Sequence, residues 1–119
     1  MNTKKIERVR GSYDGRNRSS AYQDLVFTVA TAERTDANIE TQTKATLEKI
    51  EYNLIELGSN KHKILSAQIY LANISDKVVM DKLWCEWLGP NPENWPQRAC
   101  LGVNLEGSIL IEVSVTAVR

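Results

Sequence analysis

Residues that bind metals or form disulfides are scarce in this chain of 119 residues. It has one histidine, His62, in a polar stretch, and two cysteines, Cys85 and Cys100, with no Cys-x-x-Cys spacing. One histidine cannot build a metal site with the usual ligand spacing, so we expect no metal and treat His62 as a surface residue. The cysteine usage is that of a reducing compartment, in which both thiols are free.

An excess of charge of either sign is missing too. Fifteen basic residues balance fifteen acidic ones, and the formal net charge is zero. Proteins that bind nucleic acid usually carry a basic surplus on one face, whereas the basic runs within residues 4–10 and 61–63 are short or interrupted. We therefore expect no nucleic-acid partner.

Long apolar runs are also lacking. No window approaches the ~20 apolar residues of a membrane span, and no apolar stretch follows the charged start of the chain. We infer that the protein has no membrane partner and is cytoplasmic. With 42% hydrophobic and 25% charged residues, the composition is that of one ordinary globular domain over residues 1–119.

The apolar pattern predicts strands and helices in alternation. A period of two marks strands, and apolar steps of three and four mark amphipathic helices. The expected strands cover residues 5–10, 24–32, 63–73, 98–103 and 108–118. The expected helices run from a cap at Thr35 or Asp36 to Gly58, and from a cap at Ser75 or Asp76 to Gly89. Leu65 is expected on the apolar face of its strand.

This order, β-β-α-β-α-β-β, predicts an α+β fold with a single mixed sheet and both helices packed on one face. The opposite face is semi-polar and carries Ser66, Gln68, Tyr70, Leu110, Glu112, Ser114, Thr116 and Val118. In a monomer that face is simply solvated, which antiparallel sheets tolerate. Its mixture of apolar and polar groups also suits a subunit interface that contains pockets.

Arg98 opens the strand that follows Pro96, in the row that Cys100 and Gly102 continue. One interpretation is an arginine at the rim of the sheet, whose stem covers apolar surface while its head stays in water. The other is a clamp for a planar anion, because guanidinium presents two parallel N–H donors that match a carboxylate. The residues alone leave both interpretations open.

Several ordered features carry a resemblance to a known family. The run "ETQTKATLEKIEYNLIELGSNKHKILSAQIYLANISD" is followed by "MDKLWCEWLG", "WPQRACLGV" and "LIEVSVTAV". They contain a Gln-Thr-x-Ala helix opening, a strand that ends in Tyr-Leu, a Pro-x-Arg-x-Cys element and an acid inside the last strand. Together, over about residues 24–119, they resemble the Rid/YjgF family of reactive intermediate deaminases.

The resemblance implies a chorismate-mutase-like fold and a homotrimer whose active sites lie between subunits. It also implies a cofactor-independent deaminase of the 2-iminobutanoate/2-iminopropanoate type. Such an enzyme hydrolyses reactive 2-imino or 2-enamino acids to 2-oxo acids and ammonia. On this resemblance Arg98 grips the substrate carboxylate, the backbone of Cys100 contacts the substrate, and Glu112 positions the hydrolytic water.

Three positions depart from the family pattern. The family's Ser-Gly after the central strand reads Val29-Ala30, and the asparagine of the second helix reads Asp81. We still expect Ala30 and Asp81 to contact the substrate. The early pocket tyrosine has no counterpart, because Asn17 or Arg18 stands at that point. These changes predict a pocket of altered shape or polarity.

The chemistry requires little beyond positioning. Imines hydrolyse without help, so an arginine that holds the carboxylate and a glutamate that orients water would be enough, with no metal or organic cofactor. Two alternatives stay open: a non-catalytic regulator or metabolic accessory protein that binds small molecules in the same trimeric pocket, and an RNA-directed role. The balanced charge counts against the RNA-directed role.

Overall fold

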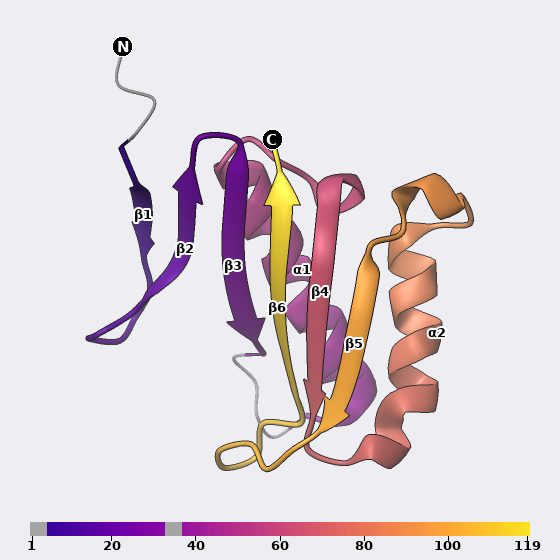
Figure 1. Ribbon diagram of the computed structural model, residues 1–119. Coiled ribbons are helices and arrows are strands. Elements are labelled where there is room, and N and C mark those ends of the chain that lie inside the picture. Colours follow the sequence, from indigo (N-terminus) through magenta and orange to yellow (C-terminus); the bar gives the residue numbers. More distant parts are fainter. Residues whose placement is uncertain (1–4, 33–36) are drawn as a thin grey trace.

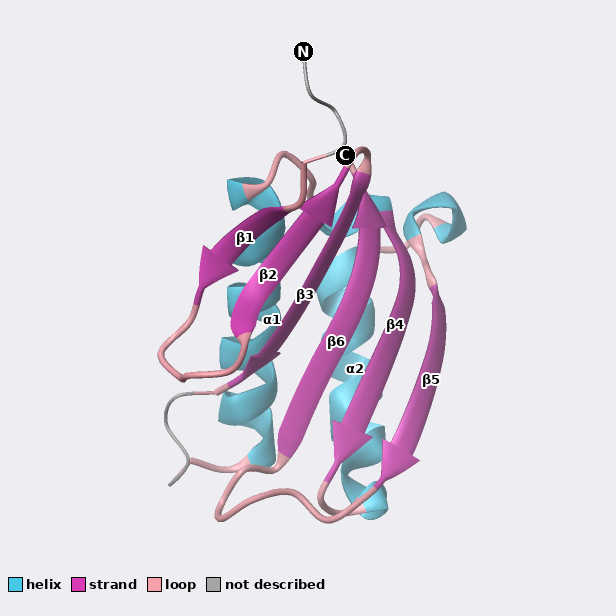
Figure 2. Ribbon diagram, turned by 60° about the vertical axis from the view of Figure 1, so that its left-hand side comes forward, coloured by secondary structure: helices cyan, strands magenta, loops and turns pink. Residues whose placement is uncertain are grey.

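The computed structural model describes residues 5–32 and 37–119. Within these ranges a six-stranded mixed sheet carries two α-helices, both on one face (Figures 1 and 2). The strands are β1 (Glu7–Arg10), β2 (Asn17–Tyr22), β3 (Leu25–Thr31), β4 (Ile64–Leu71), β5 (Gln97–Gly102) and β6 (Ile111–Val118). The α-helices are α1 (Ile39–Glu56) and α2 (Lys77–Leu88), and short 3₁₀ turns occur at Lys61–Lys63, Ile74–Asp76 and Pro92–Asn94.

The strands lie in the order β1-β2-β3-β6-β4-β5, so β5 is an edge strand. The neighbouring strands are antiparallel except β4 and β5, which are parallel and are joined through α2. A parallel pair needs such a crossover, and the crossover brings α2 alongside the β5 edge (Figure 1). The predicted mixed sheet with both helices on one face is confirmed.

The chain order differs from the prediction by one strand, because β2 forms between the first two expected strands, where we predicted none. Its inward positions are Ser19 and Ala21, both buried, which give no apolar signal in the sequence. The Ser19 hydroxyl donates a hydrogen bond of 2.9 Å to Thr28 Oγ1 on β3, so this polar group is buried with a partner. The observed order is therefore β-β-β-α-β-α-β-β.

Helix α1 begins later than we predicted. Asn38 is its N-cap, and the Asn38 side chain accepts a 2.9 Å hydrogen bond from the backbone N–H of Thr41. The expected caps, Thr35 and Asp36, lie outside the described residues. The helix is followed by Gly58 at φ +85°, a left-handed conformation that favours glycine.

The core lies between the sheet and the two helices. Its largest fully buried apolar side chains are Val26, Ile50, Leu54, Ile69, Leu71, Met80, Leu88, Ile111, Val113 and Val115. Leu65 was expected there but is 50% exposed, because the β4–β6 register shifts between Ile64 and Ser66. This irregularity turns Ile64 inward in place of Leu65. Within the described ranges, neither helix has the length and apolar character needed to cross a membrane.

The sheet face without helices, here called the open face, matches the predicted row of semi-polar residues. Tyr70, Glu112 and Ser114 are half-buried on it and alternate with core residues of β4 and β6. Apolar side chains flank this row, with Phe27 on β3 42% exposed and Leu101 on β5 49% exposed. The open face is therefore partly apolar in the single chain.

Candidate functional site

Arg98 lies on the edge strand β5 and points to the helix side of the sheet. Its register partner on β4 is Ala67, which is fully buried under the helices. Arg98 Nη2 donates a 2.6 Å hydrogen bond to Asp81 Oδ1, and the guanidinium carbon lies 5.5 Å from the centre of the Trp84 ring. The Arg98 side chain is 19% exposed, so the guanidinium is held and largely shielded from water.

Asp81 bridges two cations. Its Oδ1 accepts from Arg98, and its Oδ2 accepts a 2.8 Å hydrogen bond from Lys77 Nζ, one helical turn earlier on α2. Partial burial opposes ionisation of Asp81, but the hydrogen bonds and charges of Lys77 and Arg98 outweigh it and hold the Asp81 pKa below its usual value. Asp81 is therefore a carboxylate at neutral pH.

Together with Met80, whose sulfur lies 3.7 Å from Arg98 Nη1, these residues form the arginine cluster: Lys77, Met80, Asp81, Trp84 and Arg98. Sequence reasoning found Arg98 and Asp81 but missed the others. The signal was present in their spacing, because the four α2 residues follow one another at steps of three, one and three and so share one side of a helix. An arginine on an adjacent strand completes the cluster.

Cys100 follows Arg98 on the same side of β5, opposite the buried Ile69 on β4. Its thiol is free and half-buried. Burial raises the pKa of Cys100, and the nearby positive charges of Arg98 and Lys77 offset this in part. The thiol is thus protonated at neutral pH and is not prepared to act as a nucleophile.

Glu112 lies on the opposite face of the sheet. On β6 its register partners are Tyr70 and Thr31, and all three side chains belong to the open face. Arg98 belongs to the helix side, two strands away at the edge. One protomer therefore does not bring the predicted clamp and the predicted water-positioning acid together.

The Val29-Ala30 pair is divided in the same way. Ala30 is 7% exposed, lies opposite Val113 and points into the core, so its side chain cannot face a substrate on the open side. Val29 points to the open face beside Ser114. The predicted site residues thus form two groups: Arg98, Cys100, Asp81 and the core residue Ala30 on the helix side, and Glu112 on the open face, where Val29 also lies.

Arg18 has a role that the sequence did not reveal. Its Nη2 donates a 2.7 Å hydrogen bond to Glu56 Oε1, and its guanidinium carbon lies 5.9 Å from the centre of the Tyr52 ring. Both partners lie on α1, and the β1–β2 register is irregular at this point. Arg18 therefore ties strand β2 to α1, away from the arginine cluster.

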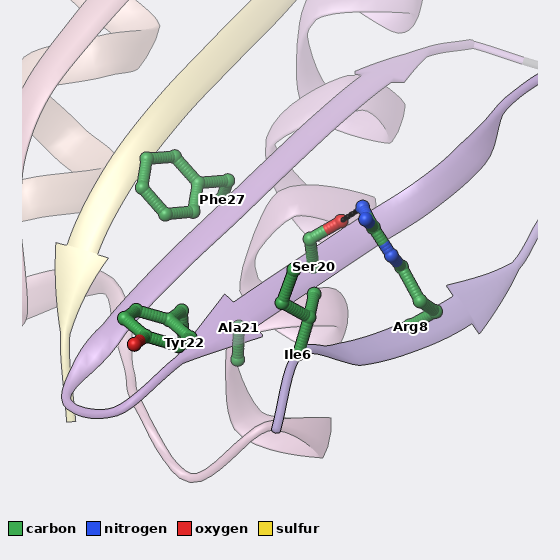
Figure 3. A pocket seen from close by; sticks show the side chains of 6 residues that line it. All are labelled: Ile6, Arg8, Ser20, Ala21, Tyr22 and Phe27. Atoms are coloured by element: carbon green, nitrogen blue, oxygen red, sulfur yellow. Dashed lines mark hydrogen bonds between the residues drawn. The ribbon is translucent and has the colours of Figure 1, made fainter. Parts of the chain in front are cut away.

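A hollow of about 340 Å³ lies over β1, β2 and β3 (Figure 3). It is lined by Ile6, Arg8, Ser20, Ala21, Tyr22 and Phe27, and Arg8 donates a 3.1 Å hydrogen bond to Ser20 across it. It is separate from both groups of predicted site residues. Among the described residues, no three side chains of histidine, cysteine, aspartate or glutamate gather as a metal site requires.

Comparison with known proteins identifies the family. The family model described as Endoribonuclease L-PSP matches residues 25–119. The chain belongs to this family, which is the Rid/YjgF family of the sequence resemblance. A RutC family protein of Haemophilus ducreyi is 37% identical over 77 residues, which are 64% of each chain. The RutC family protein YoaB of Escherichia coli is 36% identical over 56% of this chain and 59% of its own.

The chain therefore spans less than two thirds of the length of these curated relatives. Solved structures match over nearly the full chain. A member of the YjgF protein family from Neisseria meningitidis has a TM-score of 0.88 at 26% identity, covering 99% of this chain and 98% of that one. An uncharacterised protein from Pseudomonas aeruginosa also has a TM-score of 0.88, at 28% identity over 97% and 99% of the two chains.

Proposed function

We propose that this member of the Rid/YjgF family hydrolyses small 2-imino or 2-enamino acids to 2-oxo acids and ammonia, in sites shared between the subunits of a homotrimer. The observation that carries the proposal is the held guanidinium of Arg98 at the β5 edge, at the family's arginine position. A fixed guanidinium at an edge strand suits a small planar anion that approaches from a neighbouring molecule.

The reaction needs water to add to the C=N carbon of the substrate. In our proposal Arg98 holds the carboxylate, so the adjacent imine carbon has a fixed place. The water oxygen bonds to that carbon, the C=N electron pair moves to nitrogen, and nitrogen takes up a proton. The proton of the carbinolamine hydroxyl then passes to nitrogen, the C–N bond breaks as the C=O bond forms, and ammonia leaves the 2-oxo acid. Glu112 orients the water and carries its proton.

Arg98 and Glu112 lie on opposite faces of one sheet, and this supports a site built from two protomers. The edge strand of one protomer would bring Arg98 against the open face of its neighbour, where Glu112 and Val29 lie. The partly apolar open face also suits such contact, because closed cyclic assembly would cover it. No metal or organic cofactor is part of this proposal.

A second candidate is a binding protein with little turnover. It is favoured by Asp81, which already pairs with Arg98 where the family pattern has asparagine. The family description names an endoribonuclease, but the balanced net charge gives less support to an RNA-directed role than to a small anion.

The test supplies imines made in situ by an amino-acid oxidase and measures the acceleration of ammonia and 2-oxo acid release. We expect the wild-type protein to accelerate release. Arg98→Lys keeps the positive charge but loses the bidentate hydrogen-bond donor, so kcat/KM should fall by about 30-fold or more. Glu112→Gln should lower turnover and still bind 2-oxobutanoate. Binding of 2-oxobutanoate without acceleration by the wild-type protein would favour the binding protein.

A further inference from the structure

The arginine cluster already holds a carboxylate in the place where a substrate carboxylate would bind. Asp81 Oδ1 lies 2.6 Å from Arg98 Nη2, so one of the two terminal nitrogens of the guanidinium already makes a hydrogen bond within the protein. A ligand carboxylate that uses both terminal nitrogens of Arg98 must replace this contact. It must also approach a negative charge on Asp81, which is unfavourable at short range.

Lys77 provides a second ion-pair partner for Asp81. The two residues are four apart on α2, and their 2.8 Å contact uses Oδ2, the oxygen that Arg98 does not use. Asp81 can therefore leave Arg98 and keep an ion pair. The Asp81 side chain is 37% exposed and that of Lys77 44% exposed, so both have room to move at the surface.

We propose that Asp81 is a built-in competitor for Arg98 that sets the affinity for small monocarboxylates, and that Lys77 holds Asp81 aside when a ligand carboxylate takes its place. This inference rests on the proposed carboxylate-binding role of Arg98 and adds a specificity-determining pair to it. In the ligand-free state Asp81 bridges two cations. In the bound state Arg98 pairs with the ligand carboxylate and Lys77 pairs with Asp81. Each positive charge then has its own carboxylate, so the total charge is balanced.

The first arm of the test removes the competitor. Asp81→Asn keeps the size of the side chain and removes its charge, so 2-oxobutanoate should bind roughly fivefold more tightly by isothermal titration. In imine hydrolysis KM should fall while kcat stays nearly constant, because the change acts on binding. Asp81→Glu keeps the charge and should retain weak binding. Glu86→Gln removes a charge from an exposed position of the same helix and should leave the dissociation constant unchanged.

The second arm removes the residue that holds the competitor aside. Lys77→Met leaves Arg98 as the partner of Asp81, so 2-oxobutanoate should bind more weakly than to the wild-type protein. In the Asp81→Asn background the same change should have little effect, because no competitor remains. Lys82→Met, at an exposed position on α2, is the matched control. A melting curve of each variant shows which of them fold, and the dissociation constants are compared among the folded proteins.

The outcomes separate this inference from the proposed function. If the wild-type and Asp81→Asn proteins bind 2-oxobutanoate equally well, and if binding to both requires Arg98, the competitor role of Asp81 is refuted and the proposed function stands. If Lys77→Met weakens binding equally in both backgrounds, the role of Lys77 is overturned. If the wild-type and Asp81→Asn proteins both fail to bind 2-oxobutanoate and do not accelerate imine hydrolysis, the proposed function fails and this inference fails with it.

Discussion

A charged group that leaves water needs partners within its own protein, and Arg98 has three of them. Asp81 accepts its hydrogen bond, Met80 lies against one terminal nitrogen, and the Trp84 ring lies under the guanidinium. The rim interpretation assumed a head in water, which does not fit a side chain that is 19% exposed. The contacts orient the guanidinium, which any clamp requires, but they also give it a competing anion.

The lowered pKa of Asp81 makes this ion cluster sensitive to acid. Since its folded pKa lies below the unfolded value of about 3.9, ionised Asp81 contributes stability above that value and loses it as the pH falls through the folded pKa. The difference in unfolding free energy between the wild-type protein and Asp81→Asn should therefore change below about pH 4, in the direction that disfavours the wild type. Urea unfolding between pH 3 and 6, at one protein concentration, measures it. A constant difference across this range would contradict the stabilising role of the charge.

The residue types at the site were predictable from sequence, but their surroundings were not. Arg98, Cys100 and Glu112 were identified on a motif resemblance. Their division between two faces follows from strand register, and a register depends on which strands become neighbours. The pairing of Ala67 with Arg98 and of Tyr70 with Glu112 is a property of the folded sheet that the two strand patterns alone do not contain.

At the scale of elements, one buried glutamine joins the start of α1 to the start of β6. Gln42 is fully buried, and its Nε2 donates hydrogen bonds of 2.9 Å to Ala37 O and 3.1 Å to Ser108 O. Its Oε1 accepts a 2.9 Å bond from the backbone N–H of Leu110, just before the strand that carries Glu112. The glutamine of the helix-opening motif thus has a physical reason: it satisfies backbone groups of the two segments that lead into α1 and β6.

Replacing Gln42 by Leu should therefore destabilise the fold. The change removes three part-buried hydrogen bonds and leaves two backbone carbonyls and one N–H without their Gln42 partner, which should cost about 2 to 3 kcal/mol of unfolding free energy. Glu48→Leu, at an exposed position on the same helix, should change it by less than about 0.5 kcal/mol. Urea unfolding of both variants provides the comparison, and equal stabilities would show that the bridge contributes nothing.

The elements that the sequence predicted well are those with an apolar face. Helices α1 and α2 and strands β3, β4 and β6 all present apolar side chains at helical or strand spacing. Strand β2 was missed because Ser19 and Ala21 face inward, and the hydrogen bond from Ser19 to Thr28 replaces apolar packing. The inward turn of Ile64 in place of Leu65 was missed for a related reason: a register irregularity changes which residue faces the core without changing the residue types.

At the scale of the whole molecule, the layers leave one side of the sheet uncovered in the single chain. The Cα atoms extend over 48 × 38 × 19 Å, the shape of a sheet with one layer of helices. Apolar groups such as Leu25, Phe27 and Leu101 are 38%, 42% and 49% exposed on the open side. An assembly that covers them and brings the β5 edge of one protomer to the open face of the next would also complete the proposed site.

Two inactive variants should therefore restore each other. Arg98→Ala lacks the clamp and Glu112→Gln lacks the acid, so neither alone should accelerate imine hydrolysis at the wild-type rate. In trimers assembled from both, one junction pairs the intact Arg98 of one protomer with the intact Glu112 of its neighbour, and part of the activity should return. Coexpression with two different tags yields such mixed assemblies, and sedimentation at micromolar concentration should show a trimer.

The control for this experiment is a chain that carries both changes, mixed with either single variant. No junction in those assemblies has both side chains intact, so activity should stay at the level of the single variants. A site contained within one protomer would give no recovery in the mixed trimers, because every chain carries one of the two defects. Recovery of activity in the mixed trimers, without recovery in the control, would therefore place catalysis at the contact between subunits. The reason lies in the sheet: Arg98 and Glu112 of one protomer point to opposite faces, so only two protomers together can bring both side chains to one substrate.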